Sequence, residues 1–293
     1  MTEPVCVLDA RASLGEGAAW CDRTQALFWV DINASALHRF DPVAGTDQAW
    51  PMPEPVGCLA LCEDHRVVVA LASGLAWFDP QTGALDRFLP IEADEPRTRL
   101  NDGRCDHQGR LWVGSMRRSA GGPRGTLYRC TQAEAAPMLG GIEVPNCTAF
   151  SPDGGTLYFA DTPTNCIRAF TLDAASGELS EERQFASVPR DDGHPDGATI
   201  DAEGGLWVAH WDGWRISRFR PDGSLDRSIR LPVPRPTCLA FGGADLDTLF
   251  VTSARTGLDE ATLARAPLSG GLFSLRPGEI GRPEPRFRTA GPQ

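Results

Sequence analysis

The stretch RLWVGS, residues 110–115, has the composition of a buried β-strand, because apolar, β-branched and aromatic side chains follow one another almost without interruption. Steps of 40, 44, 46, 49 and 43 residues separate the central apolar residues of six such stretches. The other five are ALFWVD (26–31), RVVVAL (66–71), TLYFAD (156–161), GLWVAH (205–210) and TLFVTS (248–253). The chain is therefore built from six repeats.

Each repeat contains more than one strand. A turn-rich element such as CDHQG (105–109) precedes the apolar stretch, and most repeats continue into a further strand that ends in another turn. A period of about 40 to 50 residues with several short strands is typical of propeller blades, which bury their faces against their neighbours. We therefore expect an all-β protein, a six-bladed β-propeller with four-stranded antiparallel blades, whose single domain spans residues 1–293.

Two other architectures explain the pattern less well. A two-sheet sandwich requires the regular spacing to be a coincidence. A βαβ fold requires crossover helices, yet helical periodicity is scarce, and only GLDEATLARA (257–266) resembles a helix. The N-terminal stretch VCVLDA (5–10) is expected to add a strand to the last blade and so close the ring.

The composition excludes several functions. The net charge is -11, and all 28 basic residues are arginine. Without lysine, neither Schiff-base catalysis nor a P-loop is available. No basic cluster favours nucleic-acid or membrane binding, and no apolar run approaches the length of about 20 residues that spans a membrane. We expect reduced cysteines in a soluble, unexported, cytoplasmic protein that is a monomer or weak oligomer.

The segment HPDGATIDAEGGLWVAHWDG (194–213), together with Asp192 just before it, contains a near match to a calcium loop of the EF-hand type. A histidine occupies a position where aspartate or asparagine should stand, Pro195 is poorly placed, and no amphipathic helix flanks the segment. After Gly197 the pattern is that of a strand. We interpret the match as an accident; it involves Asp192, His194, Asp196, Gly197 and Glu203.

Oxygen-bearing side chains occur at equivalent places in four repeats, ten to twelve residues before the central apolar residue and just before the preceding apolar strand. The second repeat, around Val56 and Gly57, and the sixth, around Pro236 and Thr237, lack a carboxylate there. Equivalent positions in a propeller surround the central axis at the same end, so these side chains are expected to converge. They are Glu16, Asn101, Asp102, Asn146 and Asp196.

Converging carboxylate and amide oxygens suit one divalent metal ion. Ca²⁺ fits best, and Mg²⁺, Mn²⁺, Fe²⁺ or Zn²⁺ are possible. Each residue alone also has a structural explanation, since Asp196-Gly197 and Asn101-Asp102-Gly103 are good turn sequences.

Five ordered motifs resemble the senescence marker protein/regucalcin and gluconolactonase family, and together they span nearly the whole chain. They are LGEGAAW (14–20), RLNDGRCDHQGRLWVGSM (99–116), PNCTAFSPDGGTLYFADT (145–162), HPDGATIDAEGGLWVAHWDG (194–213) and RPTCLAFGGADLDTLFVTSAR (235–255).

The resemblance implies a six-bladed propeller and an enzyme, a metal-dependent sugar lactonase. It implies that Glu16, Asn146 and Asp196 bind the metal, and that Arg99 and Asn101 contact the substrate. Asp196 is then our candidate to orient or deprotonate the attacking water. Two alternatives stay open: another ester or organophosphate hydrolase on the same scaffold, and a non-enzymatic calcium-binding regulator.

One segment departs from the family pattern. Members that act on neutral sugars often carry an acidic residue shortly after G-[ST]-M, whereas here Arg117 and Arg118 follow Met116. An arginine there favours a lactone with an anionic group, unless both arginines are simply solvated beside the loop SAGGPRG (119–125). His194, which is two residues before Asp196, is a further candidate to line the pocket, as are Trp211 and Trp214, which follow the fifth apolar stretch.

Overall fold

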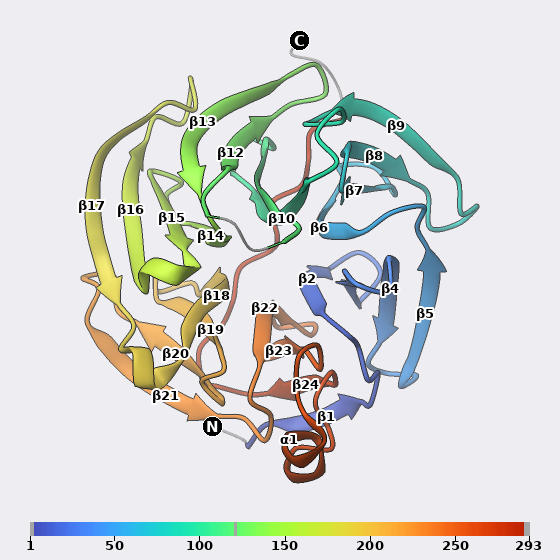
Figure 1. Ribbon diagram of the computed structural model, residues 1–293, viewed down its shortest axis with the longest axis vertical. Coiled ribbons are helices and arrows are strands. Elements are labelled where there is room, and N and C mark those ends of the chain that lie inside the picture. Colours follow the sequence, from blue (N-terminus) through green and yellow to red (C-terminus); the bar gives the residue numbers. More distant parts are fainter. Residues whose placement is uncertain (1–2, 120–121, 290–293) are drawn as a thin grey trace.

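The computed structural model describes residues 3–119 and 122–289, and its strands form six four-stranded antiparallel sheets arranged in a ring (Figure 1). The predicted six-bladed propeller is confirmed. From the innermost strand outward, the first three blades are β2 (Gly15–Cys21), β3 (Ala26–Asp31), β4 (Ala36–Asp41), β5 (Thr46–Pro51); β6 (Val56–Leu61), β7 (Val67–Leu71), β8 (Gly74–Phe78), β9 (Leu85–Pro90); and β10 (Thr98–Cys105), β11 (Leu111–Arg117), β12 (Gly125–Cys130), β13 (Ala135–Ile142).

The remaining blades continue around the ring, and the last is completed by the N-terminus. Strand β1 pairs with β24 in an antiparallel manner, so the expected closure by VCVLDA is confirmed. These strands are β14 (Pro145–Phe150), β15 (Thr156–Asp161), β16 (Cys166–Leu172), β17 (Leu179–Ser187); β18 (His194–Ile200), β19 (Leu206–Trp211), β20 (Arg215–Phe219), β21 (Leu225–Arg230); and β22 (Pro236–Gly242), β23 (Thr248–Ser253), β24 (Leu272–Leu275), β1 (Val5–Leu8).

The second strand of each blade is the apolar stretch seen in the sequence. Strands β3 and β7 are buried along their whole length, because neighbouring blades cover both faces of the sheet. The outermost strands, such as β5 and β17, are mostly exposed and correspondingly polar. The hydrophobic core therefore lies between the blades.

A repeated aspartate stabilises the turn between the first two strands. Asp106 accepts hydrogen bonds from the backbone N–H groups of Gln108 and Arg110 and from the indole of Trp112, at 2.9, 3.0 and 2.9 Å. In the fifth blade, Asp201 accepts the equivalent bonds from Glu203, Gly205 and the Trp207 indole. The sequence D-x-x-G-x-L-W thus fixes the turn and also satisfies the buried indole.

Helices are few and short. They are the 3₁₀ turns η1 (Thr162–Thr164) and η2 (Arg190–Asp192), and helix α1 (Glu260–Arg265), which Asp259 caps at its N-terminus. The expected helix near 257–266 is confirmed. Residues 194–200 form strand β18 and no α-helix flanks them within the described residues, so the EF-hand interpretation is rightly rejected. No helix in the described part of the chain is long and apolar enough to cross a membrane.

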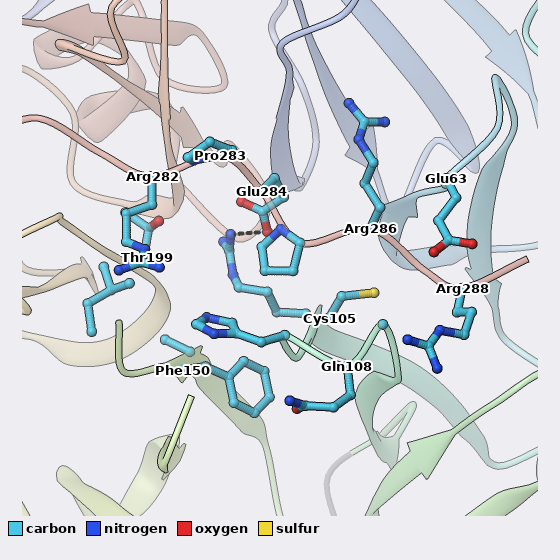
Figure 2. Close-up of a pocket in the computed structure, with 16 residues that line it drawn as sticks. Glu63, Cys105, Gln108, Phe150, Thr199, Arg282, Pro283, Glu284, Arg286 and Arg288 are labelled. Carbon is cyan, nitrogen blue, oxygen red and sulfur yellow. Dashed lines mark hydrogen bonds and ion pairs between the residues drawn. The ribbon is translucent and has the colours of Figure 1, made fainter. Parts of the chain in front are cut away.

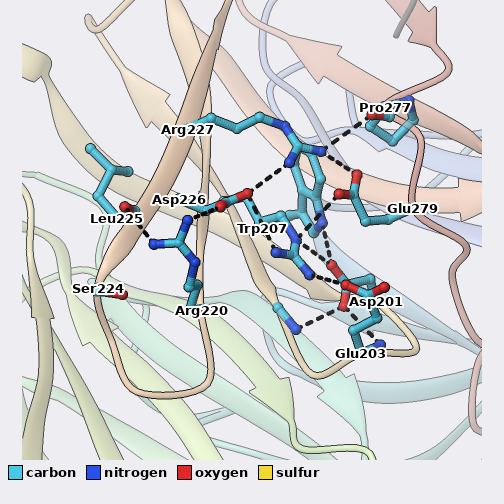
Figure 3. Close-up of polar contacts among 12 residues, drawn as sticks. Asp201, Glu203, Trp207, Arg220, Ser224, Leu225, Asp226, Arg227, Pro277 and Glu279 are labelled. Atoms are coloured by element: carbon cyan, nitrogen blue, oxygen red, sulfur yellow. Dashed lines mark hydrogen bonds and ion pairs between the residues drawn. The ribbon is translucent and has the colours of Figure 1, made fainter.

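The segment after β24 passes the fifth blade and crosses the central axis of the ring, here called the channel, to reach the second blade (Figure 1). Beside the fifth blade, Glu279 pairs with Arg227, and Arg227 also pairs with Asp226 (Figure 3). At the far side of the channel, Phe287 pairs with Cys62 by a β-bridge and is completely buried. We call residues 276–289 the C-terminal strap.

Candidate active site

Every innermost strand has a break in register at the same place. In each of the six blades, the pairing between the first and second strand shifts near the start of the first strand. Such β-bulges re-aim side chains and are common beside functional sites. The breaks fall at Glu16/Ala19, Val56/Cys58, Leu100/Gly103, Asn146/Ala149, Pro195/Ala198 and Pro236/Leu239.

The bulges explain where the predicted site residues lie. The sequence pattern placed these residues just before each innermost strand, and that placement is wrong, because Glu16, Asn101, Asn146 and Asp196 are within the strands. The bulge interrupts the normal alternation, and Cys147 adopts a left-handed conformation with φ of 56°. A strand segment can therefore carry functional side chains where a regular strand would pack against a neighbour.

The three predicted metal ligands and the two predicted substrate-binding residues all line one pocket of about 280 Å³, at the end of the channel where the innermost strands begin. Apart from these side chains and the hydroxyl of Thr162, the pocket is mostly apolar. Its lining comprises Leu14, Glu16, Arg99, Asn101, Met116, Val144, Asn146, Thr162, Asp196 and Trp211.

The two predicted substrate-binding residues are bonded to each other. Arg99 donates from Nη1 to Oδ1 of Asn101 at 2.6 Å and to the carbonyl of Leu100 at 3.0 Å. Asn101 donates from Nδ2 to the carbonyl of Pro145 at 3.0 Å. Burial lowers the pKa of Arg99 to about 10, so this guanidinium remains charged at neutral pH. Its Nε and Nη2 donors have no hydrogen-bond acceptor among the described residues and remain available to a bound molecule.

Three buried carboxyl groups come together below the pocket mouth. Burial, followed by the charge of Asp102, raises the pKa of Glu16 to about 8. Burial and the charges of Glu16 and Asp102 raise the pKa of Asp196 well above its usual value, and burial raises that of Asp102. Without a cation, these groups cannot all be ionised at moderate cost.

The donor set fits a hard divalent cation. Glu16, Asn146 and Asp196 are 7%, 4% and 5% exposed, and among the described residues the carboxylate of Glu16 accepts a hydrogen bond only from the adjacent N–H of Gly17. Oxygen donors of this kind are preferred by Ca²⁺ and Mg²⁺. Among the described residues, no group of three His, Cys, Asp or Glu side chains alone is arranged to hold a metal, and the set here includes an amide.

The segments that enter the pocket are held by the last residue of two apolar stretches. Asp31 accepts the N–H groups of Ser13 and Leu14, at 2.8 and 3.0 Å. Asp161 accepts the N–H group of Val144 at 2.9 Å in the fourth blade. Both carboxylates therefore fix the approach to a strand that carries a site residue.

Several contributors to the site were not assigned from the sequence. Asp102 shares the register of the other polar residues, which was the available signal, yet it received no role. Thr162 follows an apolar stretch and had no signal of its own. Trp211 was correctly named as a pocket residue, and Arg235 covers one face of its ring at 4.5 Å. Two further candidates, Trp214 and His194, do not line this pocket; His194 instead contacts Asn165 at 2.7 Å.

Arg118 follows Met116 on the third blade. Its N–H donates to the carbonyl of Arg97 and its Nε to that of Thr98, each at 2.8 Å, and its charge contributes to lowering the pKa of Arg99. Arg117 pairs across the strands with Thr98. Part of the loop SAGGPRG, residues 120 and 121, lies outside the described residues.

A larger pocket, of about 530 Å³, lies at the opposite end of the channel, where β10, β14 and β18 end and the C-terminal strap crosses (Figure 2). Its central charges already have partners: Arg104 pairs with Glu284 at 2.5 Å, and Arg286 with Asp22. Arg104 also donates to the carbonyls of Ala198 and Leu239. These arginines are engaged in structural contacts, whereas the smaller pocket is lined by the predicted site residues, so the smaller pocket is the candidate active site.

Residues 14–255 match the family described as the SMP-30/Gluconolactonase/LRE-like region. The chain belongs to this family. The match begins with the segment that carries Glu16 and includes all the candidate site residues. The resemblance inferred from the sequence motifs is thereby confirmed.

Three relatives of this SMP-30/gluconolactonase family member are similar to it over nearly the whole chain. An L-arabinolactonase from Azospirillum brasilense is 41% identical over 95% of this chain and 93% of its own. A 6-deoxy-6-sulfogluconolactonase from Pseudomonas putida is 38% identical, covering 96% and 97%. The structure of regucalcin from Agrobacterium tumefaciens, described as a calcium-binding protein, is 33% identical with a TM-score of 0.94, covering 97% and 96%.

Proposed function

We propose that this protein is an enzyme that hydrolyses a sugar lactone to the sugar acid. The observation that carries the proposal is the single pocket in which Glu16, Asn146 and Asp196 meet Arg99 and Asn101. The lactonase names of the two curated relatives support the reaction class. A lactone is a neutral ring ester with many hydroxyl groups, and a small polar pocket with directed donors suits it.

Metal dependence is part of the proposal. Glu16, Asn146 and Asp196 would hold one divalent cation, Ca²⁺ first, with Mg²⁺, Mn²⁺, Fe²⁺ or Zn²⁺ as alternatives. When bound, the cation would polarise the lactone carbonyl and offset the charge of the buried carboxylates. The calcium-binding description of the regucalcin relative supports this choice.

Other steps of the proposed reaction depend on the side chains of the pocket. Asp196 orients the attacking water and accepts its proton, since a carboxylate has two oxygens and one can accept a hydrogen bond while the other binds a ligand. Arg99 and Asn101 fix the sugar through directed hydrogen bonds, and the charged guanidinium favours the developing negative oxygen. The apolar side chains of Leu14, Met116 and Val144 limit the access of other water.

Replacing Asp196 with asparagine should lower kcat/KM by a factor of about 10² or more, because the variant lacks a proton acceptor. Lactone hydrolysis would be followed with a pH indicator, using metal-stripped protein and a panel of divalent ions. The matched control is Asp245→Asn, an exposed carboxylate that should retain wild-type rates. If metal binds tightly but no lactone is turned over, the ester-hydrolase and calcium-regulator alternatives take precedence.

We further propose that the natural lactone has an anionic group that Arg118 binds. The Nη groups of Arg118 form no hydrogen bond or ion pair with the described residues, and this residue is close enough to Arg99 to influence its pKa. The sulfogluconolactonase relative supports an anionic substrate, whereas the arabinolactonase relative supports a neutral one.

The variant Arg118→Glu should reduce kcat/KM for a sulfonated sugar lactone by about tenfold or more while sparing a neutral pentonolactone, because a charge-assisted contact becomes a repulsion. Steady-state kinetics on both lactones measures this ratio. Arg183→Glu, an exposed change on the outer strand β17, is the control. An unchanged ratio in the Arg118 variant would leave the neutral lactone as the preferred substrate class.

A further inference from the structure

The side-chain amide of Asn146 lies between two neighbours that fix its direction. On one side, its Nδ2 lies 2.8 Å from Oγ1 of Thr162. On the other side, its Oδ1 lies 3.5 Å from Nδ2 of Asn101. An asparagine amide presents an acceptor at one end and donors at the other, so turning it over would exchange these contacts.

The hydrogen bonds of the Thr162 hydroxyl are compatible with only one orientation of the Asn146 amide. Oγ1 of Thr162 lies 2.8 Å from the carbonyl oxygen of Pro195, and a carbonyl can only accept. The single hydroxyl hydrogen of Thr162 must therefore point to Pro195. The side of the hydroxyl that faces Asn146 is left as an acceptor, so Asn146 must present its NH₂ group to it.

The orientation of the Asn101 amide, on the other side of Asn146, is fixed in the same way. Arg99 can only donate, and it donates to Oδ1 of Asn101, which turns the NH₂ group of Asn101 toward the carbonyl of Pro145 and toward Asn146. Acceptor-only carbonyls and a donor-only guanidinium thus fix both amides without any choice of hydrogen positions.

We propose that Thr162 is a positioning residue that holds the amide of Asn146 with its oxygen toward the cation-binding pocket. The inference rests on the proposed metal role of Asn146. A cation binds the amide oxygen and not the NH₂ group, so each flip of the amide would remove a ligand. Partners of this kind that orient metal ligands typically contribute a factor of 10 to 100 in metal affinity.

The test uses the full-length, metal-stripped protein and Ca²⁺ alone, titrated by calorimetry. Thr162→Val, which keeps the shape but loses the hydroxyl, should weaken Ca²⁺ binding by about tenfold. Thr162→Ser keeps the hydroxyl and should bind Ca²⁺ as the wild type does. Thr164→Val is the matched control, because Thr164 lies in the same short helix as Thr162 but its hydroxyl donates to the backbone carbonyl of Asp161.

Repeating the Thr162→Val substitution in an Asn146→Asp variant distinguishes an effect on the orientation of the Asn146 amide from an effect on packing. In Asn146→Asp the two carboxylate oxygens are equivalent, so Thr162→Val should cause no further loss of Ca²⁺ affinity there. The same loss in both backgrounds would show that Thr162 acts through packing and would overturn the inference, as would wild-type affinity in the single Thr162→Val variant. Failure of the wild-type protein to bind Ca²⁺ would instead contradict the proposed metal role.

Discussion

Glu16, Asp102 and Asp196 are buried acidic residues that lie close enough for their negative charges to repel one another. Burial is the largest cause of the raised pKa of each group, and mutual repulsion adds to it for Glu16 and Asp196. Arg99 offsets only part of this for Glu16. The folded, metal-free protein therefore prefers these groups protonated, while a bound cation would favour the ionised forms.

The stability of the metal-free protein should fall as the pH rises from about 4.5 to about 8. The folded-state pKa of Glu16 is about 8, above its ordinary value of 4.5, so the folded state binds more protons in that window. The free energy of unfolding should decrease by roughly 1 kcal/mol per pH unit for this group.

Urea denaturation with a chelator present, at several pH values across the window, measures the effect. Glu16→Gln cannot ionise and should show a shallower dependence than the wild type. Excess Ca²⁺ should restore stability at the upper end of the window. A wild-type stability that rises over this range without metal would contradict the assigned burial of these carboxyl groups.

Among the secondary-structure elements, the innermost strands matter most for the site. Each one has a bulge near its start, and neighbouring strands approach closely there. A Cβ atom at Gly57 would lie against the carbonyl oxygens of Leu100 and Asn101, closer than side chains can approach. The second blade thus has a glycine where other blades carry functional side chains, because strand β10 occupies the space.

Gly57→Ala should lower the free energy of unfolding by about 1 to 3 kcal/mol, since backbone atoms must shift to admit the methyl group. It should also raise KM for the lactone, because the displaced strand carries Arg99 and Asn101. Thermal unfolding and steady-state kinetics measure the two effects. Gly140→Ala is the control, because nothing lies within 4 Å of a Cβ atom at that site, and its stability should stay close to that of the wild type.

Across the whole molecule, two chain ends complete the ring. Strand β1 closes the last blade, and the C-terminal strap crosses the end of the channel opposite the candidate site. Arg104 and Glu284 form an ion pair across that end. The channel is thereby left with its candidate catalytic pocket at the other end, where the innermost strands begin.

Phe287→Ala should lower the free energy of unfolding by about 3 to 5 kcal/mol, because the ring is fully buried between the second and third blades and contacts Trp77 and Phe88. Ile280→Ala is the control from the same strap, since Ile280 is 55% exposed and should cost little. Chemical denaturation compares the two. Equal stabilities would mean that the strap does not hold the blades together.

The propeller could be predicted from the spacing of its apolar stretches, because strands that are covered on both faces consist almost entirely of apolar residues. The shared register of Glu16, Asn101, Asn146 and Asp196 also predicted that they would meet, and they line one pocket. The comparisons support the expected enzyme of the sugar lactonase family, while the roles of the individual residues stay predictions.

The positions of these residues within the strands, and the contacts that orient them, depend on the folded structure. A bulge leaves no clear mark in the sequence, so the polar residues were expected before the strands instead of within them. Thr162 and Pro195 come from different blades, so the hydrogen bond from Thr162 to the carbonyl of Pro195, which fixes how Thr162 accepts from Asn146, depends on how the blades pack around the axis. Periodic burial is a local property that sequence records, whereas the direction of a hydrogen bond between distant segments exists only once the ring has closed.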